Sequence, residues 1–236
     1  MSDVPTQSTS AAAAPPTDVS VPAAAAADAG HTEVASWRLL ATLGVAGALA
    51  GGLIVLAYSA TLPRIDAHKA ALVEQAVHEV LPACVRWDTL YAAGGALTKQ
   101  RPAGADAKTA ERVFLGFDAS GSTVGAAITA GEPGFSDIVS LIFGLDPATG
   151  TLTGMKVLGH KETPGLGDKI ERDTFRAQFT GALTPLVAVK GKTSSKNEVQ
   201  AITGATISSR AVLRTINNAV ARWRPLLQAY LQGGSA

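Results

Sequence analysis

The residues best suited to chemistry lie in one short loop, Thr203-Gly204-Ala205-Thr206. Apolar residues then recur at the spacing of one helix face over residues 212–230, so this loop opens a helix. A helix N-terminus offers unpaired N–H groups and the positive end of the macrodipole, which together attract a phosphate. The small residues of the loop let the backbone approach an anion closely, while its threonine hydroxyls and that of Ser208 add hydrogen-bonding groups. The alternative is an ordinary helix start capped by Thr or Ser, without a ligand.

A second loop, rich in glycine, reads Gly159-His160-Lys161-Glu162-Thr163-Pro164-Gly165-Leu166-Gly167-Asp168-Lys169. Its proline and glycines predict a tight turn between an apolar strand and a helix, a position where ligands often meet the backbone. The spacing matches neither G-x-G-x-x-G nor the P-loop, so neither nucleotide fingerprint applies. A plain connection, in which the glycines serve only backbone geometry, is the alternative.

Strands and helices must position both loops. Short apolar runs, separated by turns rich in Asp and Gly, predict strands at 113–117, 124–130, 138–145 and 152–158. A helix is expected over 168–179, a strand over 186–189 and a last helix over 208–231. Residues 82–110, rich in Ala, Gly and Thr, give little signal. The pattern predicts one α+β domain of short antiparallel strands and packing helices.

Composition excludes several classes of protein. The chain has 236 residues, with 20 Lys+Arg against 19 Asp+Glu, and this near-zero charge argues against a nucleic-acid binder. Its one cysteine, Cys84, excludes intramolecular disulfides and multi-cysteine zinc or iron–sulfur sites. No histidine has a second ligand at metal spacing, so no metal site is expected. With 47% hydrophobic and 17% charged residues, the chain is too apolar for a disordered protein and lean in charge for a cytosolic enzyme.

The distribution of charged and apolar residues divides the chain into four segments. Residues 1–35, rich in Ala and Pro and without Lys or Arg, are expected to form a disordered tail. Residues 36–63 are predicted to form a transmembrane helix, because no charged residue follows Arg38 within them and about 20 helical residues cross the hydrocarbon core. Residues 64–81 predict a juxtamembrane amphipathic helix, and residues 82–236 the soluble domain.

Both loops and the anchor together resemble a known family. Over residues 36–231 the sequence is similar to the G subunit of the Rnf complex, a membrane electron-transfer machine, and to the related C subunit of the sodium-pumping NADH:quinone reductase. The segments that carry the resemblance are Leu62-Pro63-Arg64-Ile65, Val80-Leu81-Pro82, Glu162-Thr163-Pro164-Gly165-Leu166-Gly167 and Thr203-Gly204-Ala205-Thr206. The last two are short singly but fairly specific as a pair.

The resemblance implies FMN as the cofactor, attached covalently. In that family the final threonine of the S/T-G-A-T motif is esterified through its hydroxyl to the FMN phosphate, and here that residue is Thr206. A dedicated flavin transferase makes the bond with FAD as donor. By analogy the second loop lines the flavin, and Lys161 and Lys169 are candidates to favour reduced, anionic flavin by their charge. The implied cofactor-binding residues are Thr206, Thr203, Gly204, Ala205, Ser208, Glu162, Thr163, Gly165, Leu166, Gly167 and Lys169.

The same resemblance implies an electron-transfer role rather than stand-alone catalysis. The chain would relay electrons between neighbouring membrane subunits in a complex that couples the current to ion translocation, and the flavin transferase would be its partner during maturation. The implied location is the bacterial inner membrane, with a single span and the FMN domain on the periplasmic side. The charge count points the other way, because Arg38 precedes the span closely whereas Arg64 and Lys69 follow it.

Two alternatives stay open. One is a component like the C subunit of a sodium-translocating quinone reductase, with the same chemistry in another complex. The other is a membrane-anchored assembly or binding module with noncovalent flavin or none. Gln200 supports the latter, because it stands three positions before the S/T-G-A-T motif, where the family often has an acidic residue.

Overall fold

The computed structural model describes residues 36–102 and 110–233. The tail predicted at 1–35 therefore lies outside the described residues. The chain divides into two compact units, which meet between Ala57 and Tyr58, and each is considered by itself. The described residues of the first unit are all helical and all exposed.

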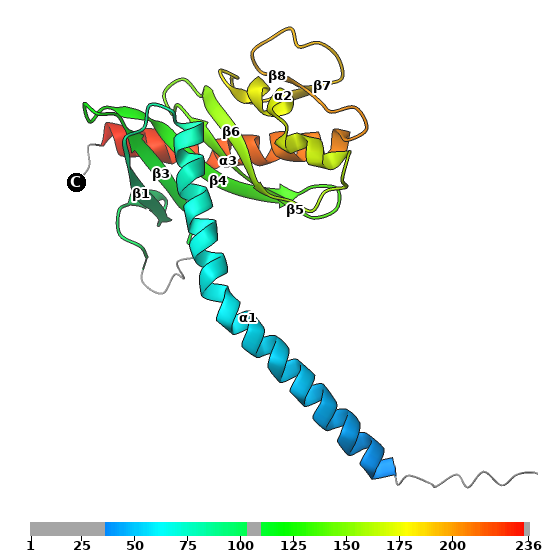
Figure 1. The fold of residues 1–236 in the computed structure, drawn as a ribbon. Helices are drawn as coiled ribbons and strands as arrows, with labels where there is room; N and C mark the ends of the chain where they lie inside the picture. The colour runs from blue at the N-terminus through cyan, green and yellow to red at the C-terminus, as the bar shows by residue number, and fades with distance from the viewer. Residues whose placement is uncertain (1–35, 103–109, 234–236) are drawn as a thin grey trace, which may run out of the picture. The chain divides into compact units, whose positions relative to one another are not determined.

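Helix α1 covers Ser36–Val80, so one continuous helix runs through both predicted helical segments, with Pro63 inside it (Figure 1). Among the described residues it is the one helix that is long and apolar enough to cross a membrane. It ends two residues before Pro82, which agrees with the steric conflict between proline and helical backbone at the preceding residue. The segments predicted at 36–63 and 64–81 are thus helical, and the helix ends one residue before the predicted end at 81.

The second unit is built on a six-stranded antiparallel sheet, in the order β2-β1-β3-β4-β5-β6. Its strands are β1 Arg86–Ala93, β2 Ala96–Thr98, β3 Arg112–Phe117, β4 Thr123–Pro133, β5 Ile138–Leu145 and β6 Leu152–Gly159. The four predicted strands correspond to β3–β6, and they form consecutive antiparallel pairs as expected for short connections. Strands β1 and β2 come from the segment that gave little signal.

The predicted helix over 168–179 is wrong. The structure has three short turns of helix there, in η1 Gly167–Glu171, α2 Asp173–Arg176 and η2 Ala177–Phe179. Arg172 breaks the helix because its backbone is extended, with φ −69° and ψ 143°. This break lets Ile170, Phe175 and Phe179 all reach the core.

The remaining elements complete the domain. Strand β7, Val187–Val189, pairs in parallel with β8, Glu198–Gln200, which was not predicted. Helix α3, Thr206–Gln232, begins two residues earlier than expected and carries the predicted apolar face. Of the seven residues on that face, Tyr230 is half-buried and six are buried, namely Val212, Ile216, Ala219, Val220, Trp223 and Leu227.

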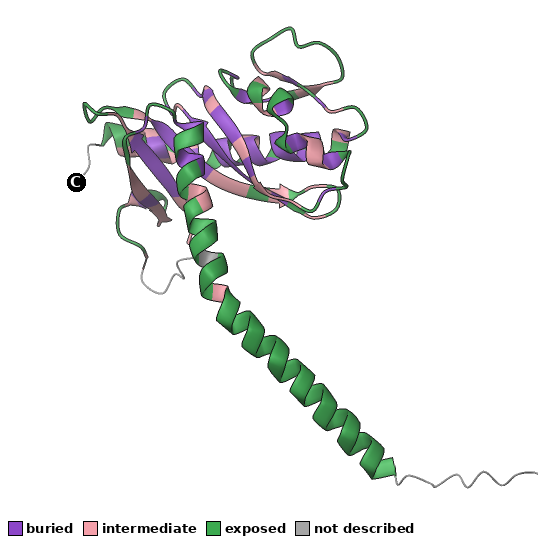
Figure 2. Ribbon diagram, viewed as in Figure 1, coloured by how far each residue is buried: buried purple, intermediate pink, exposed green. Residues whose placement is uncertain are grey.

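Two hydrophobic cores cover the two faces of the sheet (Figure 2). Successive strand residues point to opposite faces, and in β3 Val113 and Leu115 pack in the core with α3 whereas Phe114 packs in the other. The second core receives the end of α1, through Val80 and the following Leu81 among others. The close approach requires glycine, because a Cβ on Gly144 of β5 would overlap the backbone carbonyl oxygen of Val80. The end of α1 from Ala76, within the predicted juxtamembrane helix, is thus packed in the core of the second unit.

Candidate functional site

A cavity of about 330 Å³ lies where three separate segments meet. These are the turn between β4 and β5, the glycine-rich loop after β6, and the first turn of α3. Its walls are formed by Phe135, Glu162, Thr163, Leu166, Gly167, Gly204, Ala205, Thr206, Ile207 and Ser208. The two loops singled out in the sequence therefore line one space, although about 40 residues separate them.

The carboxylate of Glu162 ties the three segments together. Glu162 is buried, with an exposed fraction of only 5%. Oε1 accepts hydrogen bonds from the backbone N–H groups of Phe135 at 2.8 Å and Ser136 at 3.1 Å, and Oε2 accepts one from the hydroxyl of Ser208 at 2.6 Å. A buried anion is costly unless donors surround it, and here the β4–β5 turn and α3 supply them to a carboxylate from the glycine-rich loop. Glu162 therefore holds the cavity in shape.

The pKa of Glu162 predicts how acid affects this arrangement. Burial raises the pKa, but the hydrogen bonds from the Ser208 hydroxyl and from the backbone at Ser136 and Phe135 together lower it below its ordinary value. Because the pKa of Glu162 is lower in the folded state, its ionised carboxylate stabilises the folded domain. This contribution is complete above the unfolded-state pKa of about 4.3 and is lost as the pH falls through the folded-state pKa. We therefore expect wild-type Tm to exceed that of Glu162→Gln at neutral pH and the gap to narrow in acid. Circular dichroism melts of the full chain in detergent measure this, and a gap independent of pH would contradict it.

Helix α3 starts at Thr206 without a side-chain cap, so the ordinary capped start considered above does not hold. Ala205 occupies the capping position, and the nearby hydroxyl of Ser209 accepts the N–H of Ile202 instead. Within the described ranges, no acceptor is present for the N–H groups of Thr206, Ile207 and Ser208. Free donors at the positive end of a helix dipole are the arrangement that binds phosphate.

Backbone geometry brings the two loops together at Gly204. Its φ of +84° lies in the left-handed region, which glycine adopts without strain. A Cβ at this position would lie 3.3 Å from Leu166 Cδ2, so the absence of a side chain also permits the contact with the glycine-rich loop. Backbone conformation and the contact with Leu166 thus both explain why glycine stands at the second position of the T-G-A-T segment.

Large apolar side chains around the cavity are exposed. Phe135 is 65% exposed, Leu166 is 44% exposed and Ile207 is 56% exposed. One comes from each of the three segments. Apolar side chains gathered around one cavity favour an apolar ligand surface, because covering them removes their surface from water.

Eight of the eleven residues expected to bind the cofactor line the cavity; the other three, Thr203, Gly165 and Lys169, do not appear in its described walls. Thr203 and Gly165 are exposed, and Lys169 is half-buried in η1. Lys161 points to Asp137, with Nζ 3.0 Å from Oδ2, and is also outside the walls. The effect of Lys161 and Lys169 on a flavin therefore stays a prediction.

Phe135 and Ile207 were not among the residues expected from the sequence. Phe135 lies in the β4–β5 turn and reaches the cavity only because the strands pair up to Pro133 and Ile138. No local pattern links that turn to a loop 27 residues later. Ile207 offered a weak signal, since it is an apolar residue outside the buried face of α3.

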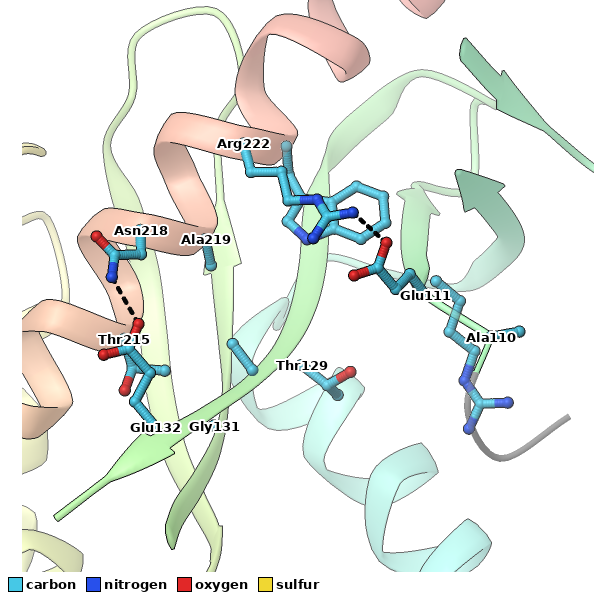
Figure 3. A pocket seen from close by; sticks show the side chains of 12 residues that line it. Ala110, Glu111, Thr129, Gly131, Glu132, Thr215, Asn218, Ala219 and Arg222 are labelled. Carbon is cyan, nitrogen blue, oxygen red and sulfur yellow. Dashed lines mark hydrogen bonds and ion pairs between the residues drawn. The ribbon is translucent and has the colours of Figure 1, made fainter. Parts of the chain in front are cut away.

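A second cavity, of about 370 Å³, lies between β4 and α3 (Figure 3). Charged side chains at its walls and edge are tied to one another. Arg222 pairs with Glu111, while Asn218 and Arg214 each bond to Glu132 at 2.6 Å. These contacts brace α3 against the sheet, and the groups are already engaged, so we place the candidate site at the first cavity.

The chain is also similar to known proteins. A family model described as an FMN-binding domain matches residues 134–221, a span that contains every residue lining the first cavity. The chain is 30% identical to the G subunit of the ion-translocating oxidoreductase complex of Methanosarcina acetivorans, over 78% of this chain and 92% of that protein. It is 32% identical to the G subunit of the complex of the same name from Aliivibrio fischeri, over 72% of this chain and 82% of that one.

A solved structure is also similar. The crystal structure of the C subunit of the Na(+)-translocating NADH-quinone reductase from Parabacteroides distasonis is matched over 60% of this chain and 80% of that one, with 20% identity and a TM-score of 0.48. The sequence relatives are the stronger finding, since they extend over most of both chains. On their evidence, the chain belongs to the family of G subunits of the ion-translocating oxidoreductase complex, the Rnf family.

Proposed function

We propose that this chain is the electron-transfer subunit of an ion-translocating membrane complex, and that it carries FMN through a phosphoester bond to Thr206. The observation that carries the proposal is the convergence, in one cavity, of a threonine hydroxyl, unpaired helix N–H groups and an apolar rim. The match to an FMN-binding domain and the relationship to G subunits support it.

The residues present fit FMN at both of its ends. The free N–H groups of Thr206, Ile207 and Ser208 would hold the phosphate. The side chains of Phe135 and Leu166, with that of Ile207, would cover the isoalloxazine and keep water from it. Bound there, FMN would supply the ability to take up and release electrons, while the protein fixes its position and surroundings.

Attachment requires a second protein. In the proposed reaction the Thr206 oxygen forms a bond to the FMN phosphorus of FAD, the pyrophosphate P–O bond breaks, AMP leaves and the hydroxyl proton is released. The one carboxylate in the described cavity walls, that of Glu162, is already occupied by three donors. We therefore assign activation of the hydroxyl to a flavin transferase and treat this chain as its substrate.

The proposal also includes a place in the cell. The apolar part of α1 would anchor the chain in a bacterial inner membrane beside other subunits of the complex, and the FMN domain would lie on the periplasmic side. Free flavin is scarce outside the cytoplasm, so a covalent bond would keep the carrier loaded there. The family relationship is given more weight than the small excess of Arg64 and Lys69 after the span.

Gln200 suggested the alternative of an assembly or binding module with noncovalent flavin or none, and its position in the structure bears on that alternative. Its backbone lies in β8, where its N–H donates to Gln178 Oε1 at 2.7 Å, and its side chain is exposed. Gln200 is not part of the described walls of the cavity. An acidic residue at this place would therefore act on recognition by a transferase rather than on holding the flavin.

Loss or retention of colour on denaturation tests the proposal. The full chain is produced together with a flavin transferase, purified in detergent, unfolded in guanidinium and dialysed. We expect the flavin absorbance to stay with the polypeptide. Colour that leaves on dialysis would indicate noncovalent flavin, and a colourless protein beside a flavinylated control protein would indicate an assembly module; both results contradict the proposal.

A further inference from the structure

The cavity contains one ionisable group. Among the described residues that line it, Glu162 alone has a side chain that carries charge. Its three hydrogen-bond donors, from Phe135, Ser136 and Ser208, are neutral groups. They satisfy the carboxylate oxygens without cancelling the negative charge.

The basic side chains nearest to it in the sequence are engaged elsewhere. Lys161 pairs with Asp137 at 3.0 Å, and His160 Nε2 faces Glu171 at 3.2 Å. The other ring nitrogen, His160 Nδ1, accepts the backbone N–H of Glu162 rather than contacting its carboxylate. In the described parts of the chain no salt bridge involves the Glu162 carboxylate. The wall of the cavity thus holds an anion without a counter-ion.

We propose that Glu162 lowers the reduction potential of the flavin in this cavity by fixing a negative charge in its wall. The inference rests on the proposed function. Two electrons and one proton added to the neutral oxidised isoalloxazine give a product with one negative charge at neutral pH. A nearby anion disfavours that product, and burial strengthens the effect because the local dielectric is lower and salt screens less.

The Glu162 carboxylate is expected to stay negatively charged near neutral pH. The hydrogen bonds to Glu162 lower the pKa of its carboxyl below the ordinary value, so the group stays ionised near neutral pH. Its contribution to the potential is therefore expected to be constant around neutrality.

Hydrogen bonding alone does not require a charged residue here. A glutamine would place its carbonyl oxygen before the N–H groups of Phe135 and Ser136, and its NH₂ group would face the Ser208 oxygen. Glu162→Gln therefore removes the charge with little change in shape. Glu171→Gln is the matched control, because Glu171 ends η1 just after the glycine-rich loop, and its side chain is 53% exposed and outside the described cavity walls.

The test is a spectroelectrochemical titration of the flavinylated full chain in detergent, with dithionite as the source of electrons. We expect the midpoint potential of Glu162→Gln to move to a more positive value, while Glu171→Gln remains at the wild-type value within error. An unchanged potential in Glu162→Gln, or an equal shift in both variants, would overturn the inference. A purely structural role would change melting temperature or flavin loading without moving the potential.

A second variant covers the case in which Glu162→Gln does not fold or load. Ser208→Ala keeps the carboxylate and removes its hydroxyl donor, so the less compensated charge is expected to move the potential to a more negative value. No shift, or a positive one, would contradict the role of Glu162. A wild-type chain without covalent flavin would contradict the proposed function itself, whereas loaded variants with the wild-type potential contradict only the role of Glu162.

Discussion

Thr206→Ala is expected to reduce covalent flavin to background while the domain stays folded. The substitution removes the hydroxyl that would form the phosphoester bond, and no other threonine shares its place at the first residue of α3. Alanine is a good helix former, so α3 should keep its stability, and there is no side-chain cap at its start to lose. In-gel flavin fluorescence after SDS denaturation, on full chains produced with a flavin transferase, measures the result.

Two matched variants make this result specific. Thr206→Ser keeps a hydroxyl at the same position and should retain fluorescence. Thr203→Ala removes an exposed hydroxyl three residues earlier, outside the described walls of the cavity, and should also retain it. A fluorescent Thr206→Ala band would place the attachment elsewhere, and a dark Thr203→Ala band from folded protein would show that the loss of flavin is not specific to Thr206.

Gly167→Ala is expected to destabilise the domain by about 1–3 kcal/mol through overpacking. A Cβ on Gly167 would lie 2.7 Å from Glu162 Oε2 and 2.9 Å from Ser208 Oγ, so it would push apart the hydrogen bond that joins loop and helix. For a domain of this size such a loss lowers Tm by roughly 2–12 °C. Thermal denaturation of the full chain in detergent measures the shift, and flavin loading should fall with it.

Gly159→Ala is the control for that experiment. Gly159 is the last residue of β6 and precedes Glu162 in the chain. A Cβ at Gly159 would meet no atom within 4 Å. Its Tm should stay near wild type, since substitutions away from packed features usually change stability by less than about 0.5 kcal/mol. Equal Tm values for the two variants would mean that the packing around Glu162 does not constrain this loop.

The sequence was most informative where local chemistry and local structure coincide. The T-G-A-T segment lies directly before a strong helical periodicity, so its position at the start of α3 could be predicted. Strands β3–β6 alternate with turns of recognisable type, which placed them within a few residues. That the two loops share one cavity was implied by the family resemblance, and the packing of the chain now gives it a physical basis.

Long-range contacts account for what sequence reasoning missed. Phe135 enters the cavity through strand pairing. The family resemblance did imply Glu162 as a site residue, but its role in joining three segments was not expected, because its hydrogen-bond donors lie 26, 27 and 46 residues away. Nothing local distinguishes such a glutamate from one on the surface. The helix expected over 168–179 failed for a similar reason, because burial of Ile170 and Phe179 favours extended backbone at Arg172 over continuous helix.

The central claim, a covalent bond between FMN and Thr206, is tested most directly by peptide mapping. Trypsin cuts after Lys196 and Arg210, so one peptide, residues 197–210, contains all four candidate hydroxyls, those of Thr203, Thr206, Ser208 and Ser209. We predict that fragmentation of this peptide from the wild-type protein places a mass of FMN less one water on Thr206. An unmodified peptide from protein produced with an active transferase, or FMN located on Thr203, Ser208 or Ser209, would contradict this claim.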